Sequence, residues 1–293
     1  MKLSKKLRQQ LSDVLQQWSQ SLPPLAKEVD FSAKAFRWQQ QQLHAIPQIK
    51  NVYLDDLKGI DTQKQKIIQN TLQFLHGFPA NDVLLTGARG TGKSSLVRAL
   101  LTEFYAQGLR LIEIERDDLA DLPKIHALIA KRKEKFIIYC DDLAFNAENE
   151  HYRSLKSVLD GALQSGSGNF IIYATSNRRH LLPEFMHENT PVRVVDVPQY
   201  HELHPQEAIE EKISLSDRFG LWLSFYSMDQ ALYLQIVQHY VEQAGLTFDE
   251  DVQMASLRWS QSRGQRSGRA AYQFAKHWIG TQALAKVQQN VGE

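Results

Sequence analysis

The chain has 293 residues, with 34 Lys and Arg against 33 Asp and Glu, a formal net charge of +1 and a hydrophobic share of 43%. This composition predicts a globular protein with a sizeable core and gives no electrostatic sign of a nucleic-acid partner. A single cysteine, Cys140, excludes an internal disulfide framework. Since there is neither a recognisable signal peptide nor an apolar run near ~20 residues, we expect no membrane contact and a cytoplasmic location.

The first 50 residues are expected to form a helical accessory segment. Apolar residues recur at helical spacing from Leu7 to Trp18, and Pro23-Pro24 ends the pattern. The remainder is rich in Gln, with four in a row at 39–42. Two interpretations stay open: an element that binds a partner or bridges subunits, and a helix packed on the chain's own core.

Residues 51–228 are expected to form an α/β core. Short apolar runs suited to buried parallel strands alternate with helix-periodic segments, which predicts a parallel sheet with helices on both faces. The expected strands are Val83–Thr86, Leu109–Ile114, Phe136–Cys140, Phe170–Thr175 and Leu221–Phe225, and the expected helices are 94–107, 122–132, 151–163 and 205–213. The long connection 178–217 contains an alternating stretch at 192–197 that would suit a hairpin strand.

Helical patterns alone remain in residues 229–293. They predict three helices, around 231–240, 252–259 and 270–285, and hence a small helical lid domain. Four arginines cluster in it: Arg258, Arg263, Arg266 and Arg269. A solvated face, a nucleic-acid patch and a contact to a bound nucleotide are all consistent with this cluster.

A glycine-rich loop after the first expected strand predicts the ligand chemistry. Gly87-Ala88-Arg89-Gly90-Thr91-Gly92-Lys93-Ser94 fits the pattern G-x-x-x-x-G-K-[ST] between a strand and a helix. Its backbone N–H groups and the following helix dipole favour phosphate oxygens. Lys93 is expected to reach the β- and γ-phosphates of ATP or ADP, and the Ser94 hydroxyl is expected to face Mg²⁺.

Polar residues at the ends of two later strands complete the expected site. The strand 136–140 is followed by Asp141, placed to supply an oxygen ligand near Mg²⁺, and by Asp142, placed to deprotonate an attacking water. Asn177 follows the strand 170–175 and would hold that water or a phosphate oxygen, although an Asx-turn explains it equally well. Arg218 precedes the last strand and either serves a phosphate in a neighbouring subunit or pairs with Asp217 at the surface.

The order of these elements resembles the AAA+ ATPases, and most closely a bacterial AAA-type ATP-binding family known only as a domain of unknown function. The resemblance covers about residues 50–280. The stretches that carry it are Leu57 to Asp61, Asn70-Thr71, Gly87 to Ser95, Cys140 to Leu143, Ala174 to His180, Leu215 to Gly220 and Ser267 to Arg269.

The resemblance implies a role for each candidate residue. Gly59 and Ile60 would line the adenine pocket, and the loop through Ser95 would bind the nucleotide. Ser94 and Asp141 would hold Mg²⁺, Asn177 would be the sensor-1 residue, Arg218 an arginine finger acting in trans, and Arg269 the sensor-2 arginine of the lid. The second Walker B acid is usually Glu, whereas this chain has Asp142, which puts fast hydrolysis in question. Ring-like assembly of identical subunits, a hexamer being one such ring, is also implied.

Three functions compete at this point. The favoured one is an oligomeric Mg-ATP hydrolase that remodels or assembles a protein partner. The second is a slow-turnover module in which ATP controls binding, as the shorter Asp142 would suit. The third, a nucleic-acid ATPase, rests on the arginine cluster alone, so a nucleic-acid partner is not expected.

Overall fold

The computed structural model describes residues 29–143, 169–177 and 218–291 of the chain. The expected helices at 7–18, 151–163 and 205–213 and the expected strand at 192–197 lie outside these residues. One seven-stranded sheet organises the core, in the order β2-β1-β4-β5-β6-β3-β7. All neighbouring strands are parallel except the edge pair β1 and β2.

The five strands expected in the core are all present. They are β3 (Val83–Gly87), β4 (Leu109–Ile114), β5 (Lys135–Cys140), β6 (Phe170–Ser176) and β7 (Leu221–Phe225). Almost every residue of β3, β5 and β6 is buried, which explains their continuous apolar runs. The predicted helices 94–107 and 122–132 correspond to α3 (Lys93–Phe104) and α4 (Leu122–Ile129), extended by the short 3₁₀ turns η2 (Tyr105–Gln107) and η3 (Arg116–Asp121).

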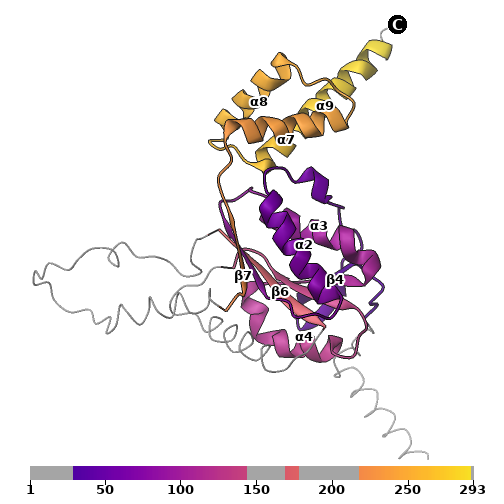
Figure 1. Cartoon of the computed structure of the whole chain (residues 1–293). Helices are drawn as coiled ribbons and strands as arrows, with labels where there is room; N and C mark the ends of the chain where they lie inside the picture. The colour runs from indigo at the N-terminus through magenta and orange to yellow at the C-terminus, as the bar shows by residue number, and fades with distance from the viewer. Residues whose placement is uncertain (1–28, 144–168, 178–217, 292–293) are drawn as a thin grey trace, which may run out of the picture.

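Helices cover both faces of the sheet (Figure 1). One face packs on α3 and on α2 (Asp61–Leu75), a helix absent from our prediction, through residues such as Ile67, Leu96 and Tyr173. The other face packs on α4 through residues such as Ile125 and Phe136. A third apolar cluster holds together α7 (Gln230–Gln243), α8 (Glu250–Ser262) and α9 (Gly268–Val291), which form the expected C-terminal helical region beyond one end of the core.

The expectation of helix is wrong for residues 35–45. They form an antiparallel hairpin of β1 (Ala35–Gln39) and β2 (Gln42–Ala45), and β1 joins the sheet parallel to β4. Gln40 and Gln41 make the two-residue turn with φ of 51° and 59°. Positive φ at both turn positions matches the twist of the two strands. Such turns usually contain Asn and Gly, so the run of Gln residues gave no sign of a turn. Trp38 anchors the hairpin by donating from Nε1 to Asp121 Oδ2 at 3.1 Å.

The acidic residue Asp82 ties three strands together just before β3. Its Oδ1 accepts the Ile172 N–H at 2.6 Å, and its backbone oxygen accepts the Leu221 N–H at 3.2 Å. Burial raises the pKa of Asp82 from 3.8 to about 6, against the opposing effect of the Ile172 hydrogen bond. A folded-state pKa above the unfolded value means that the stability tied to the protonated carboxyl is complete below about pH 4 and is lost as the pH rises through about 6.

Asp82→Asn is therefore expected to stabilise the protein at pH 8 by about 3 kcal/mol and near pH 4 by only about 1 kcal/mol or less. The Asn amide keeps the acceptor for Ile172 and carries no charge at any pH. Urea unfolding of both proteins at pH 4.5 and pH 8 measures the difference. A variant that is less stable than the parent at pH 8 would show that the ionised carboxylate is needed.

Candidate functional site

The glycine loop lies where ligands bind in open α/β sheets. It follows β3, which is flanked by β6 and β7, and it leads into α3. The chain leaves β3 at the carboxyl edge of the sheet, between strands that come from distant parts of the sequence. The N-terminus of α3 carries no side-chain cap and no acidic residue in its first turn. Its N–H groups and dipole therefore favour an anion.

Lys93 is buried inside this loop. Its Nζ donates to the backbone oxygens of Gly87 at 2.6 Å and Ala88 at 2.8 Å, and to Oδ1 of Asn177 at 3.1 Å. The residue is 6% exposed. Burial lowers the pKa of Lys93, and the carboxylates of Asp141 and Asp142 oppose that effect. The structure thus brings the two expected phosphate contacts, Lys93 and Asn177, into direct contact.

The expected magnesium ligands also lie together. Ser94 Oγ donates to Asp141 Oδ1 at 2.9 Å, and the same carboxylate oxygen accepts from Thr175 at 2.5 Å and Tyr139 at 2.7 Å. Burial raises the pKa of Asp141, but these three hydroxyl donors outweigh it, so the pKa lies below its ordinary value. An ionised carboxylate beside a serine hydroxyl is a donor set that suits Mg²⁺.

Asp142, the expected general base, has its carboxylate between two side chains. Asn177 Nδ2 donates to Asp142 Oδ1 at 2.5 Å, and Arg89 lies 3.4 Å from Oδ2. The backbone at Asp142 is left-handed, with φ of 56°, and its N–H donates to Thr175 Oγ1 at 2.9 Å. Asp and Asn tolerate this conformation better than Glu does, because their short polar side chains bond locally. The backbone therefore gives a physical reason for Asp at this position.

The lid contacts the tip of the loop through the start of α9. The Gly268 N–H donates to the Gly90 backbone oxygen at 2.8 Å. Gly90 has φ of 76°, and a Cβ there would lie 2.8 Å from Ser267 Cβ, so both conformation and space require glycine. Arg269 follows directly, with its own Cβ 3.7 Å from that position. The structure thus brings Arg269 beside the loop.

The segment expected to line the adenine pocket lies between the loop and the lid. Ile60 Cδ1 is 3.7 Å from a Cβ built on Gly92. Gly59 has φ of 72°, and a Cβ there would lie 2.5 Å from Leu232 Cδ2 on α7. Gly59 and Ile60 therefore contact both elements that would surround a base. The remaining loop residues Thr91 and Ser95 are held at the start of α3, where Thr91 Oγ1 donates to Ala88 O at 2.8 Å.

Arg218 is the one expected site residue that lies away from this cluster. It stands three residues before Leu221, which pairs with Val83, whereas Gly87 pairs with Phe225 at the other end of the same two strands. Four residue steps along a strand are about 13 Å, so Arg218 is at the opposite edge of the sheet from the loop. The structure therefore does not bring Arg218 together with the other expected site residues.

Prediction from sequence missed Tyr139 and Thr175 as parts of the site. Residues two apart on a strand face the same side, so Tyr139 had to share a face with Asp141. That alternation was the available signal for Tyr139. Thr175 bonds both Asp141 and Asp142 across the β5–β6 pair, and no sequence pattern indicated that contact.

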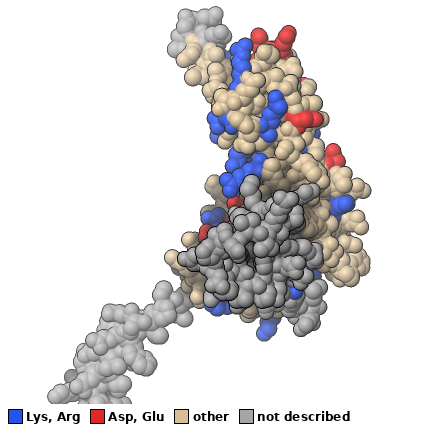
Figure 2. All heavy atoms as spheres, turned by 90° about the vertical axis from the view of Figure 1, so that its left-hand side faces the viewer, with Lys and Arg blue, Asp and Glu red and all other residues tan. Residues whose placement is uncertain are grey.

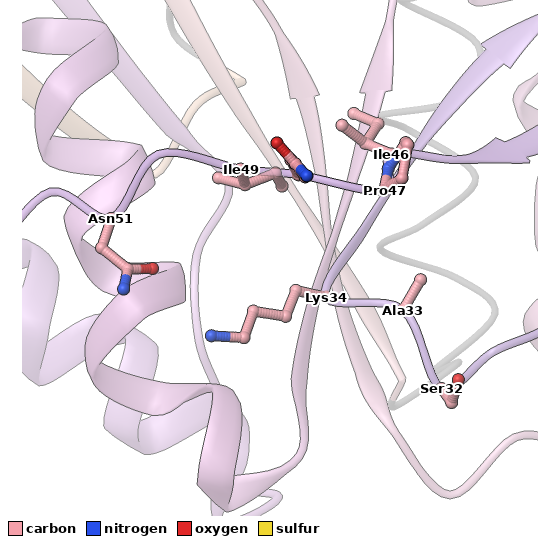
Figure 3. A pocket seen from close by; sticks show the side chains of 8 residues that line it. Ser32, Ala33, Lys34, Ile46, Pro47, Ile49 and Asn51 are labelled. Atoms are coloured by element: carbon pink, nitrogen blue, oxygen red, sulfur yellow. The ribbon is translucent and has the colours of Figure 1, made fainter.

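The surface carries two further features, a group of basic side chains and a hollow. Lys and Arg side chains gather where the lid meets the core (Figure 2). A separate hollow lies beside the hairpin, lined by Ser32, Ala33, Lys34, Ile46, Pro47, Gln48, Ile49 and Asn51 (Figure 3). Since β1 is four strand positions from β3, about 19 Å across the sheet, this hollow forms no part of the site. Lys34 is the one charged residue among those that line the hollow, and its Nζ lies 4.9 Å from the ring centroid of Tyr105.

The described residues contain no cluster of three or more His, Cys, Asp and Glu that would hold a metal by protein ligands alone. No helix in the described ranges combines the length and apolar character needed to cross a bilayer.

Comparison with known proteins identifies a family and a fold. A family model described as "Protein of unknown function (DUF815)" matches residues 31–282. RuvB of Thermotoga maritima, described as a Holliday junction branch migration motor, superposes with a TM-score of 0.51 and 16% identity over 80% of this chain and 66% of that chain. AMPPCP-bound DnaA of Aquifex aeolicus gives a TM-score of 0.48 and 17% identity over 73% of this chain and 60% of that chain. A search of curated proteins finds no match.

Proposed function

The chain belongs to the DUF815 family and has the fold of the AAA+ ATPases, and from this premise we propose that it binds and hydrolyses Mg-ATP. The observation that carries the proposal is the buried Lys93 in the glycine loop, joined through Asn177 to Asp142 and flanked by the Ser94–Asp141 pair. These residues supply a cation for phosphates, a ligand set for Mg²⁺ and a base for water at one place.

Each residue then has a chemical task. Lys93 and the N–H groups of the loop bind the terminal phosphates. Ser94 and Asp141 would hold Mg²⁺, whose charge would offset that of the phosphates. Asp142 accepts a proton from the attacking water, and Asn177 orients that water with its neutral amide. Arg269 on the lid adds a second positive charge near the loop, while Gly59 and Ile60 contact the adenine ring of the nucleotide.

Assembly into a ring of identical subunits is part of the proposal. Arg218 precedes β7 at the end of the strands remote from the loop, and this position supports a role in a neighbouring subunit rather than in its own. We propose that it completes the adjacent site in trans and that ATP turnover drives the remodelling of a protein partner. Measuring the mass in solution with and without Mg-ATP tests the assembly step directly. A chain that stays monomeric at all nucleotide and protein concentrations contradicts it.

Asp142→Asn is expected to bind ATP normally and to hydrolyse it at least about 100-fold more slowly. Asn keeps the oxygen that accepts from Asn177 and suits the left-handed backbone, so the change removes the base without straining the chain. Equilibrium binding of ATP and single-turnover phosphate release measure the two effects. Unchanged turnover would mean that another group, or water alone, takes the proton.

A slow-turnover binding module is the main alternative. It is favoured by the contacts of the Asp142 carboxylate with Arg89 and Asn177, which keep the base occupied. A turnover of many ATP per second at saturating nucleotide would discard this alternative.

A nucleic-acid-coupled ATPase is a second candidate function. Our expectation against a nucleic-acid partner finds no support in the comparisons, and the basic side chains between lid and core offer a surface for a phosphate backbone (Figure 2). Binding of DNA or RNA by this route weakens steeply with salt. Salt-sensitive binding together with DNA- or RNA-stimulated phosphate release would favour this candidate over a protein partner.

A further inference from the structure

Tyr139 is a buried tyrosine whose hydroxyl points at the expected magnesium carboxylate. It is 2% exposed, and its OH donates to Asp141 Oδ1 at 2.7 Å. Tyr139 lies in β5 and Asp141 directly follows the strand, two residues on, so both side chains lie on the face of the sheet that packs on α3. A phenylalanine would fill the same apolar space, and the hydroxyl therefore adds a polar contact that packing does not require.

The contact belongs to a set that fixes how the carboxylate is turned. Within the described residues, the three hydroxyls that donate to Asp141 come from Tyr139 on β5, Thr175 on β6 and Ser94 on α3, and all reach Oδ1. Donors from three elements restrict rotation of the carboxylate about its Cβ–Cγ bond. Since all three hydroxyls donate to Oδ1, they leave the acceptor capacity of Oδ2 for a cation or for water bound to that cation.

We propose that Tyr139 is a positioning residue for the divalent cation that accompanies the nucleotide, acting through its hydrogen bond to Asp141. The proposal rests on the nucleotide-binding function proposed above. Groups that orient metal ligands commonly change metal affinity 10–100-fold when they are removed. Tyr139→Phe is therefore expected to weaken the Mg²⁺-dependent part of nucleotide binding about 10-fold and to leave metal-free binding unchanged.

The neighbouring strand offers a matched control. Tyr173 on β6 is the register partner of Tyr139, is fully buried and faces the same apolar cluster. Its hydroxyl contacts Thr71 at 2.9 Å and Asn70 at 3.2 Å on α2 instead of Asp141. Tyr173→Phe therefore removes the same atom from the same layer of the sheet and leaves Asp141 untouched.

The experiment compares the parent with both variants. It measures the dissociation constant of a fluorescent ADP analogue in EDTA and in Mg²⁺. It also measures Mn²⁺ binding to the ADP complex by electron paramagnetic resonance. The proposal is supported if Tyr139→Phe, and not Tyr173→Phe, reduces the increase in ADP affinity that Mg²⁺ causes and also weakens Mn²⁺ binding. It is overturned if Tyr139→Phe equals the parent, or if both variants lose the same amount, since the hydroxyl then acts only on stability. A parent protein that binds no ADP overturns the proposed function itself, and the inference with it, which separates the two failures.

Discussion

Lys93→Ala is expected to abolish ATP binding at micromolar concentrations and to lower phosphate release at least about 100-fold. The reason is that Lys93 is the buried cation of the loop, already surrounded by the oxygens of Gly87, Ala88 and Asn177. Alanine removes the charge and leaves those oxygens without their donor, and no other lysine lies in the loop 87–95. Calorimetric titration with ATP and a phosphate-release assay measure the two effects.

Lys124→Ala is the matched control for that experiment. Lys124 lies on α4, on the opposite face of the sheet, and its Nζ is 2.7 Å from Asp121. Its removal deletes one lysine charge far from the loop, so binding and turnover should stay at the parent level. Circular dichroism confirms that both variants fold. If Lys93→Ala binds ATP as tightly as the parent does, the loop is not the phosphate site.

Arg218→Ala is expected to lower turnover about 10³-fold and to change the affinity for ATP less than about 2-fold. An arginine that stabilises transition-state charge in a neighbouring subunit contributes to the rate but contacts no nucleotide in its own subunit. Arg132→Ala is its control, because Arg132 stands three residues before β5 as Arg218 stands three residues before β7. The control loses an ion pair with the partly buried Glu134 at the same edge of the sheet and should keep its activity.

Mixing the two inactive variants tests the trans arrangement itself. A ring that contains Lys93→Ala and Arg218→Ala subunits has some sites in which an intact loop meets an intact Arg218 from the neighbour. The mixture should regain a measurable part of the parent activity, although each variant alone is inactive. A mixture without activity, under conditions where mixed assemblies form, would show that both residues must come from one subunit.

Much of the core was predictable because its signals are local. A buried parallel strand needs an uninterrupted apolar run, and all five such runs became strands with ends within one residue of prediction. The loop 87–94 was predictable for a similar reason, since glycines with positive φ and a lysine at fixed spacing are one continuous motif. The lid helices were predicted from the spacing of their apolar residues. That spacing is regular because the three helices pack on one another through an apolar cluster of their own.

Other elements were missed where the local signal was weak or misleading. The inward face of α2 mixes Ile67 and Phe74 with the polar Asn70 and Thr71, which bond to Tyr173 and so satisfy their polar groups inside the core. That mixture hides the helical period. The hairpin 35–45 was hidden by Gln residues, which favour helix in isolation and are rare in turns with positive φ.

The order of residues along the chain sufficed to identify the candidate groups: a glycine-rich loop with one lysine, two acids after one strand and a polar end to another, each within a few consecutive residues. Which of these groups come into contact depends on the folded arrangement. Asn177 bridges Lys93 and Asp142, α9 rests on Gly90, and Arg218 stands at the far edge of the sheet. Tyr139 and Tyr173 are a further example. They are paired in neighbouring strands, yet the hydroxyl of Tyr139 bonds to Asp141 and that of Tyr173 bonds to Thr71. The reason is physical: strand order and register set distances between residues far apart in the chain, and no short sequence pattern encodes those distances.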